Sequence, residues 1–237
     1  MQTELLLYDL TDSPFCAKAR IALNLKGVTW RRVTLTVGRL RELRRLNPIG
    51  KVPVLVDGST IVPDSHAILR HLEEHHPEPR LLPDDPAARA YCTVLEAWAD
   101  QALYPLIGAF KWLNRANRAR ALSTTADEMA PGLLRPVVAM ALLQRTRWQL
   151  AAQGLTRGGL ADFTLRMRGH VAALDTLLAG RPFLLGRNPL LCDIAVFAQL
   201  SWMRGYAEGR LLEEAPAVME WLDRMAEIPA VEAALSS

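Results

Sequence analysis

The sequence has no hydrophobic run that approaches the eighteen residues needed for a membrane-spanning helix. Its first residues, Met1-Gln2-Thr3-Glu4, lack the basic stretch that begins a secretory leader. The formal net charge of +3 is too small to indicate a nucleic-acid-binding protein. We therefore expect a cytoplasmic protein that engages neither membranes nor nucleic acid.

Cysteine is also scarce. Cys16, Cys92 and Cys192 are far apart and odd in number, which excludes a disulfide framework and any zinc-ligand spacing. We expect free thiols in a reducing compartment and no bound metal. Half of the residues are hydrophobic and 22% are charged, as in ordinary globular proteins, so a chain of 237 residues can bury one large core or two modest ones.

Short strands and helices alternate up to about residue 77. Strands are expected at 5–8, 29–33, 54–56 and 60–62, and helices at 14–26, 40–46 and 64–75. Asp57-Gly58 between the last two strands indicates a hairpin with a type I′ turn. This βαβ–α–ββ–α order is that of an α/β thioredoxin-like domain, which we place at residues 1–78.

Prolines interrupt this pattern. Residues 77–86 contain four prolines, and we predict a linker at 79–88. No convincing strand follows the linker. Helical periodicity predicts an all-α domain at 89–237, with helices at 87–118, 133–153, 160–178, 189–203 and 215–225.

The most informative segment is Asn47–Leu55, in which Pro53 stands at the mouth of a strand. If the Val52–Pro53 peptide bond is cis, the main-chain N–H and C=O of Val52 turn outward and can pair with a peptide-like ligand. Asp64-Ser65 is suited to cap the next helix, whose N-terminus attracts a carboxylate. Together these segments predict a small site for an anionic peptide.

These segments resemble those of the soluble glutathione transferases, and Ser13, three residues before Cys16, resembles the serine of the theta- and delta-like classes. The resemblance covers nearly the whole chain. It implies the glutathione transferase fold, glutathione as co-substrate, a small hydrophobic electrophile as second substrate, and a homodimer.

Ser13 is the catalytic residue that the resemblance implies. Thioredoxin-like oxidoreductases carry Cys-x-x-Cys at this place, and Cys16 alone cannot run a dithiol cycle. A hydroxyl that donates to a thiolate contributes about 1.5–3 kcal/mol, which lowers a thiol pKa by roughly one to two units. Ser13-Pro14 is equally suited to start a helix without any catalytic role.

The resemblance also implies two groups of binding residues. The residues expected to bind glutathione are Phe15, Arg39, Lys51, Val52, Pro53, Asp64 and Ser65. The residues expected to line the electrophile pocket are Tyr104, Phe110 and Trp112, although aromatic residues at helical spacing are more often core residues. Asp64 departs from the family pattern, which more often has Glu before the serine.

A further similarity runs from Arg181 to Asp193, where the family has an element that nucleates a core helix. Leu190 stands where the family has Ser or Thr, so we expect Asn188 to cap this helix and Asp193 to have a structural role. The segment at 120–155 is longer than the family requires. Two roles are open for this segment: it shapes the electrophile pocket, or it forms part of the dimer surface.

Two other functions remain open. Cys16 is the working thiol if the protein is a glutathione-dependent reductase. The glutathione site is a partner-binding or stabilising element if the protein is a non-catalytic interaction module, because fold alone does not determine function.

Overall fold

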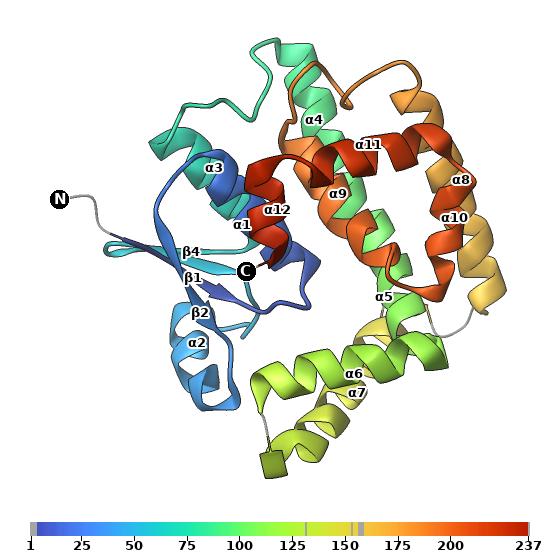
Figure 1. Ribbon diagram of the computed structural model, residues 1–237. Coiled ribbons are helices and arrows are strands. Elements are labelled where there is room, and N and C mark those ends of the chain that lie inside the picture. The colour runs from blue at the N-terminus through green and yellow to red at the C-terminus, as the bar shows by residue number, and fades with distance from the viewer. Residues whose placement is uncertain (1–3, 131, 153, 156–158, 237) are drawn as a thin grey trace.

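The computed structural model describes residues 4–130, 132–152, 154–155 and 159–236. Its single four-stranded sheet has the order β2-β1-β3-β4 (Figure 1). β1 and β2 are parallel, and the remaining pairs are antiparallel. The strands are β1 (Leu5–Asp9), β2 (Trp30–Thr34), β3 (Val54–Asp57) and β4 (Thr60–Pro63), and the accompanying helices are α1 (Pro14–Leu25), α2 (Leu40–Leu46) and α3 (Ser65–His75). The predicted α/β element order is confirmed.

The hairpin turn differs from its prediction by one residue. Asp57 pairs with Thr60 in the ladder, so the loop consists of Gly58 and Ser59. Gly58 has a φ of 59°, whereas Ser59 has no positive φ. A two-residue loop with glycine first and a single positive φ fits a type II′ turn. The prediction of a type I′ turn at Asp57-Gly58 is therefore wrong.

The rest of the described chain is helical, as predicted. After α4 (Pro86–Trp98) comes one π-helical turn (Ala99–Leu103), which leads into α5 (Tyr104–Leu113). The following helices are α6 (Arg115–Met129), α7 (Arg135–Ala152), α8 (Leu160–Leu178), α9 (Leu191–Met203), α10 (Arg210–Glu213), α11 (Pro216–Ala226) and α12 (Pro229–Ser236), and 3₁₀ turns lie at Val37–Arg39, Gly132–Leu134 and Ala207–Gly209. No helix within the described residues is long and apolar enough to cross a membrane.

The helix predicted at 87–118 is divided at Asn114. This residue has extended backbone angles (φ −71°, ψ 124°), and its side-chain oxygen accepts the amide hydrogen of Ala116 at 3.0 Å. Asn114 therefore ends α5 and caps α6. The chain changes direction there, which allows α6 and α7 to form a separate helical hairpin.

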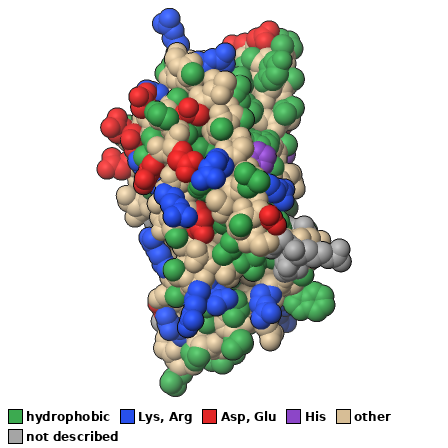
Figure 2. Space-filling view, turned by 90° about the vertical axis from the view of Figure 1, so that its right-hand side faces the viewer, with side chains coloured by type: hydrophobic (Ala, Val, Ile, Leu, Met, Phe, Trp, Pro, Cys, Tyr) green, Lys and Arg blue, Asp and Glu red, His purple; other side chains and the backbone are tan. Residues whose placement is uncertain are grey.

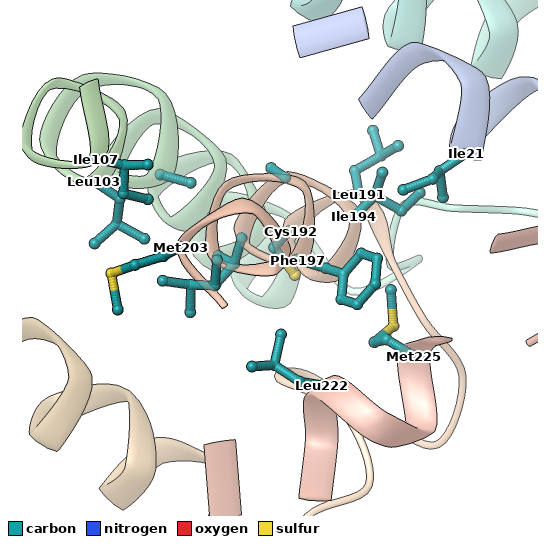
Figure 3. Packing of buried hydrophobic residues seen from close by; sticks show 14 of the residues in the cluster. Ile21, Leu103, Ile107, Leu191, Cys192, Ile194, Phe197, Met203, Leu222 and Met225 are labelled. Atoms are coloured by element: carbon teal, nitrogen blue, oxygen red, sulfur yellow. The ribbon is translucent and has the colours of Figure 1, made fainter. Parts of the chain in front are cut away.

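Helix α9 lies at the centre of the hydrophobic core. Figure 3 shows its side chains Leu191, Ile194 and Phe197 between residues from α1, the α5 region and α11. The core is therefore shared by the sheet-containing part and the helical part of the chain. α12 lies against α1 in Figure 1, and Arg20 of α1 donates to the carbonyl of Ala234 at 2.8 Å. These contacts fix the position of α1.

The start of α9 also differs from its prediction. The helix begins at Leu191 and Leu190 is its N-cap residue, so Asn188 is not the cap. A leucine side chain cannot accept a hydrogen bond, and only the reciprocal half of the capping box exists: the amide of Leu190 donates to Asp193 Oδ2 at 3.0 Å. Asp193 Oδ1 accepts the amide of Leu184 at 2.9 Å and the indole N–H of Trp221 at 3.0 Å. Asp193 is fully buried, so its role is structural.

Replacing Asp193 by alanine is expected to lower the free energy of unfolding by about 3–5 kcal/mol, because two buried donors and one half-buried donor lose their acceptor. Asp162 provides a matched control, since it occupies the same helical position in α8, is exposed, and within the part of the chain that the structure describes accepts only the amide of Gly159, at 3.4 Å. Asp162→Ala should cost a small fraction of that energy. Urea unfolding followed by circular dichroism measures both, and equal losses would contradict a core role for Asp193.

Candidate functional site

Ser13 lies at the N-terminus of α1, directly after the loop that leaves β1. Its backbone is extended (φ −129°, ψ 116°), and its Oγ accepts the amide hydrogen of Cys16 at 3.3 Å. The side chain is half-buried. The hydroxyl is therefore at the positive end of the α1 dipole, where a negative charge is favoured. A hydroxyl that accepts one bond can still donate its own proton to an anion.

Cys16 lies one turn further into α1 and is fully buried. Burial raises the pKa of its thiol above the ordinary value, and the negative charge of Asp9 raises this pKa further. A hydrogen bond with Ser13 only partly opposes these effects. Because the thiolate is the nucleophilic form, these surroundings favour a packed cysteine over a reactive one.

Asp12, in the loop between β1 and α1, accepts hydrogen bonds from two helices that follow the sheet-containing part of the chain. Asp12 Oδ2 accepts a hydrogen bond from Lys111 Nζ of α5 at 2.6 Å and another from Thr125 Oγ1 of α6 at 2.6 Å. Lys111 is buried, and its ammonium group lies 4.1 Å from the ring centre of Trp202. The residue that precedes Ser13 is thus anchored to α5 and α6.

Thr11 is held by Glu128, also from α6. The Glu128 carboxylate accepts the amide of Thr11 at 3.0 Å and its hydroxyl at 2.8 Å. Arg32 of β2 links Glu128 (2.6 Å) to the buried carboxylate of Asp9 (2.5 Å). Sequence reasoning missed these anchors. Their sole sequence signal is weak: Thr125 and Glu128 are three apart and share one face of a helix.

Pro53, Asp64 and Ser65 are brought together at the start of α3. The Val52–Pro53 peptide bond is cis. The amide of Asp64 donates to the carbonyl of Pro53 at 3.3 Å, and Asp64 Oδ1 accepts the amide of His66 at 2.8 Å. Asp64 therefore caps α3 as predicted, with a φ of 80°, and Ser65 is buried in the first turn. Lys51 nearby is exposed, and its carbonyl accepts Asn47 Nδ2 at 2.9 Å.

An acidic group from α4 and the π-helical turn adjoins the start of α3. Glu96 contacts Arg70 at 2.7 Å and His66 at 3.2 Å, and Lys18 Nζ joins it to Asp100 at 2.8 and 2.7 Å. Burial raises the pKa of Asp100, Lys18 opposes this, and the charges of Glu96 and Asp64 raise the pKa further. The Asp64 charge is thus one of the negative charges that act on Asp100. Sequence reasoning missed this group, although Glu96 and Asp100 have the spacing of one helix face.

The remaining predicted residues lie in different surroundings. Phe15 packs against Tyr104 with ring centres 4.6 Å apart, and burial raises the pKa of the Tyr104 phenol. Trp112 is half-buried, with its ring centre 5.2 Å from Lys111 Nζ. Phe110 is fully buried in the core, so of the three aromatic residues predicted for the electrophile pocket only Tyr104 and Trp112 have exposed surface. Arg39 is exposed and pairs with Glu42 at 3.4 Å.

Two family models match the chain. The model of the glutathione S-transferase N-terminal domain matches residues 7–80, and that of the glutathione S-transferase C-terminal domain matches residues 157–224. Together the two matches cover more than half of the chain. Residues 81–156, which contain α4 to α7, lie outside both matches.

Among curated relatives, glutathione S-transferase Z2 of Arabidopsis thaliana is 38% identical over 93 residues, which are 38% of this chain and 42% of that protein. Maleylacetoacetate isomerase of Mus musculus is 38% identical over 108 residues, which are 43% of this chain and 50% of that protein. The chain therefore spans half or less of the length of these relatives.

A solved structure of a glutathione transferase family member from Pseudomonas fluorescens, with two glutathione bound, has a TM-score of 0.72 and 21% identity to this chain. The alignment covers 98% of this chain and 92% of that one. At this level of identity, the likeness shows the fold alone.

The burial of Cys16, Cys92 and Cys192 predicts that the folded protein has no rapidly reacting thiol. Modification with a maleimide at neutral pH should be slow, and it should become fast for all of these thiols once urea unfolds the chain. Peptide mass mapping identifies the modified residue. A folded-state reaction at Cys16 as fast as that of free glutathione would contradict the buried environment and favour the reductase alternative.

Proposed function

Because the chain belongs to the glutathione S-transferase family, we propose that it binds glutathione and that Ser13 activates the glutathione thiol. The thiolate then attacks a small hydrophobic electrophile, or adds to it reversibly and isomerises it. The observation that carries this proposal is the half-buried hydroxyl of Ser13 at the N-terminus of α1, beside a cysteine whose own thiol is buried. The serine-type site itself resembles the theta and delta classes, whereas a further curated relative, from Euphorbia esula, is named a zeta-class glutathione S-transferase.

The chemistry of activation is electrostatic. A donated hydrogen bond to the thiolate, worth about 1.5–3 kcal/mol, lowers the thiol pKa from its ordinary value of about 8.5 by roughly one to two units. The positive end of α1 acts in the same direction. A larger fraction of bound glutathione is then ionised at neutral pH.

The start of α3 supplies the site for the other end of glutathione. The amides of the first α3 turn and the hydroxyl of Ser65 suit the γ-glutamyl carboxylate, as at other helix N-termini. The carboxylates of Asp64 and Asp100 suit the neighbouring ammonium group. The main chain of Val52 beside Pro53 pairs with the peptide backbone, and the exposed Lys51 and Arg39 are candidates for the glycine carboxylate.

The electrophile is proposed to bind beside Phe15, Tyr104 and Trp112. Isomerisation is favoured as one reaction because a maleylacetoacetate isomerase is among the relatives. The family likeness also supports a homodimer, and Ile61 of β4 together with Tyr91 and Val94 of α4 are exposed apolar side chains that such an assembly would cover.

Ser13→Ala is expected to lower kcat about 10–100-fold at neutral pH, because the pKa of bound glutathione rises by one to two units. Ser65→Ala should instead weaken glutathione binding and leave the thiol pKa unchanged. The thiolate absorbance of bound glutathione against pH, calorimetric titration with glutathione, and turnover of a chlorinated nitroaromatic electrophile separate these effects.

The same measurements distinguish the alternatives. Unchanged turnover in Ser13→Ala, with loss of deglutathionylation in Cys16→Ala, would establish the reductase chemistry instead. An unmodified chain that fails to bind glutathione at millimolar concentration would establish a non-catalytic module.

The bond between Thr125 and Asp12 predicts that Thr125→Val lowers kcat about 3–10-fold, the equivalent of one buried hydrogen bond. Glutathione affinity should change little, because Thr125 contacts the Ser13 loop and not the start of α3. Thr125→Ser should restore activity. Thr124→Val is the matched control, since among the described residues the Thr124 hydroxyl bonds only to the Arg120 carbonyl of its own helix. Equal losses in both variants would show that helix stability, and not the loop anchor, matters.

A further inference from the structure

The hairpin of α6 and α7 exposes an unusual amount of apolar surface. Five of the twelve exposed large hydrophobic side chains among the described residues lie within residues 133–148: Leu133 (97% exposed), Leu134, Val137, Met140 and Trp148 (80%). Such clustering is uncommon on a monomeric surface and indicates an interaction site. This surface lies in the part of the chain that neither family model matches.

The opposite side of the hairpin is already occupied. Met129 of α6 belongs to a hydrophobic cluster with Tyr8 and Val33 of the sheet, and Val138 and Leu142 of α7 pack against that cluster. The outward residues of α7 are therefore not needed for attachment to the rest of the protein. Together with the bonds of Thr125 and Glu128 to the Ser13 loop, this packing makes the hairpin a fixed platform.

Met140 of this exposed surface also lines a groove. A cavity of about 390 Å³ lies between the two helices, with Ala119 and Leu122 of α6 on one side and Ala139, Met140 and Leu143 of α7 on the other. The two alanines allow a backbone to approach closely. A concave apolar groove between helices is the shape that receives an amphipathic helix. A flat lipid surface would not fill it.

The positive charge of the hairpin favours a ligand that carries acidic groups. Residues 115–152 contain six arginines and two acidic residues, an excess of four positive charges in a chain whose net charge is +3. Both acids are engaged: Asp127 pairs with Arg135, and Glu128 pairs with Arg32. Figure 2 shows basic and hydrophobic side chains with few acidic ones over its lower end, where Figure 1 places α6 and α7.

Three of the six arginines lie one helical turn beyond residues that line the groove. Arg115 and Arg118 precede the groove residues Ala119 and Leu122 by one helical turn, and Arg147 follows Leu143 by one turn. Because α6 and α7 form a hairpin, the start of α6 and the end of α7 both lie at its open end (Figure 1). Within the described ranges, no acidic side chain forms an ion pair with any of these three.

We propose that the groove between α6 and α7 binds an amphipathic helix of a partner protein. The apolar face of that helix fills the groove, and acidic side chains at one of its ends meet Arg115, Arg118 and Arg147. Apolar contact supplies affinity, and the charges set orientation and partner choice. This surface is separate from the residues proposed to bind glutathione.

A displayed library of helical peptides tests the proposal on the full chain. Its members carry a fixed leucine stripe, and their flanking positions are randomised among Glu, Lys and Ala. We expect selection to enrich Glu at one end of the helix, and the affinity of the selected peptides, measured by fluorescence anisotropy, to fall as salt concentration rises. Enrichment of Lys, or no enrichment at all, overturns the proposal.

Two variants locate the binding site. Ala139→Trp fills the groove, and Arg115→Glu/Arg147→Glu reverses charge on exposed side chains without touching the core; each should weaken the selected peptides at least tenfold. The control Arg181→Glu/Arg187→Glu makes the same charge change on exposed residues before α9 and should change affinity less than twofold. Circular dichroism and thermal melting verify folding.

Two results point to other occupants and overturn the proposal. One is binding to phosphatidylserine vesicles, reduced by the same variants, without any peptide binding. The other is self-association in analytical ultracentrifugation that disappears with Ala139→Trp, which would make the groove an interface between two copies of this chain.

Discussion

The geometry of the candidate site depends on the hydrogen bonds that the carboxylate of Asp12 accepts. This carboxylate accepts hydrogen bonds from Lys111 of α5 and Thr125 of α6, and Ser13 is the next residue along the chain. Burial lowers the pKa of Lys111, and the charge of Asp12 opposes that change. A buried ion pair of this kind adds little net stability, because desolvation offsets attraction. We infer that its contribution is positional: it determines where the loop can lie relative to the helical region.

The two sides of the α6–α7 hairpin therefore have different surroundings. Its inner side holds Thr11 and Asp12 and packs on the sheet, and its outer side carries the apolar groove. A partner in the groove would influence turnover only if its binding moved Thr125 or Glu128 relative to the loop. By thermodynamic linkage, a ligand beside Ser13 would then change affinity for the partner by the same factor. If the hairpin binds without moving, the two sites are independent.

Local sequence signals predicted much of the fold. The Ser13 and Asp64 caps, the strands of the sheet and the bounds of α8 all follow from short-range patterns, and the structure confirms them. The errors arise where a local signal was ambiguous. Helical periodicity continues across Asn114, although its side chain can cap a new helix. At α9, long-range bonds from Asp193 to Leu184 and Trp221 replace the missing cap.

The side chains that bond to the loop before Ser13 could not be predicted from the sequence for a different reason. Asp12 is 99 residues from Lys111 and 113 from Thr125, and Thr11 is 117 from Glu128. A lone threonine or glutamate on a helix has no spacing that identifies such a partner. The packing of the hairpin against the sheet brings Thr125 and Glu128 to the loop, and that packing includes the apolar cluster of Met129 with Tyr8. Lys111 reaches Asp12 from α5 instead.

We propose Ser13 over Cys16 as the working residue because their three-residue spacing puts Ser13 at the cap of α1 and Cys16 inside the helix. The cap position leaves Ser13 at the rim of the helix, half-buried, with its hydroxyl in the field of the helix N-terminus. The next turn carries Cys16 into the core, where burial and the Asp9 carboxylate both raise its thiol pKa. This contrast supports the proposal that the N-terminus of α1 stabilises the sulfur of a bound peptide and not that of Cys16. A hydroxyl at the rim and a thiol in the core together suit a protein that activates a thiol supplied by its ligand.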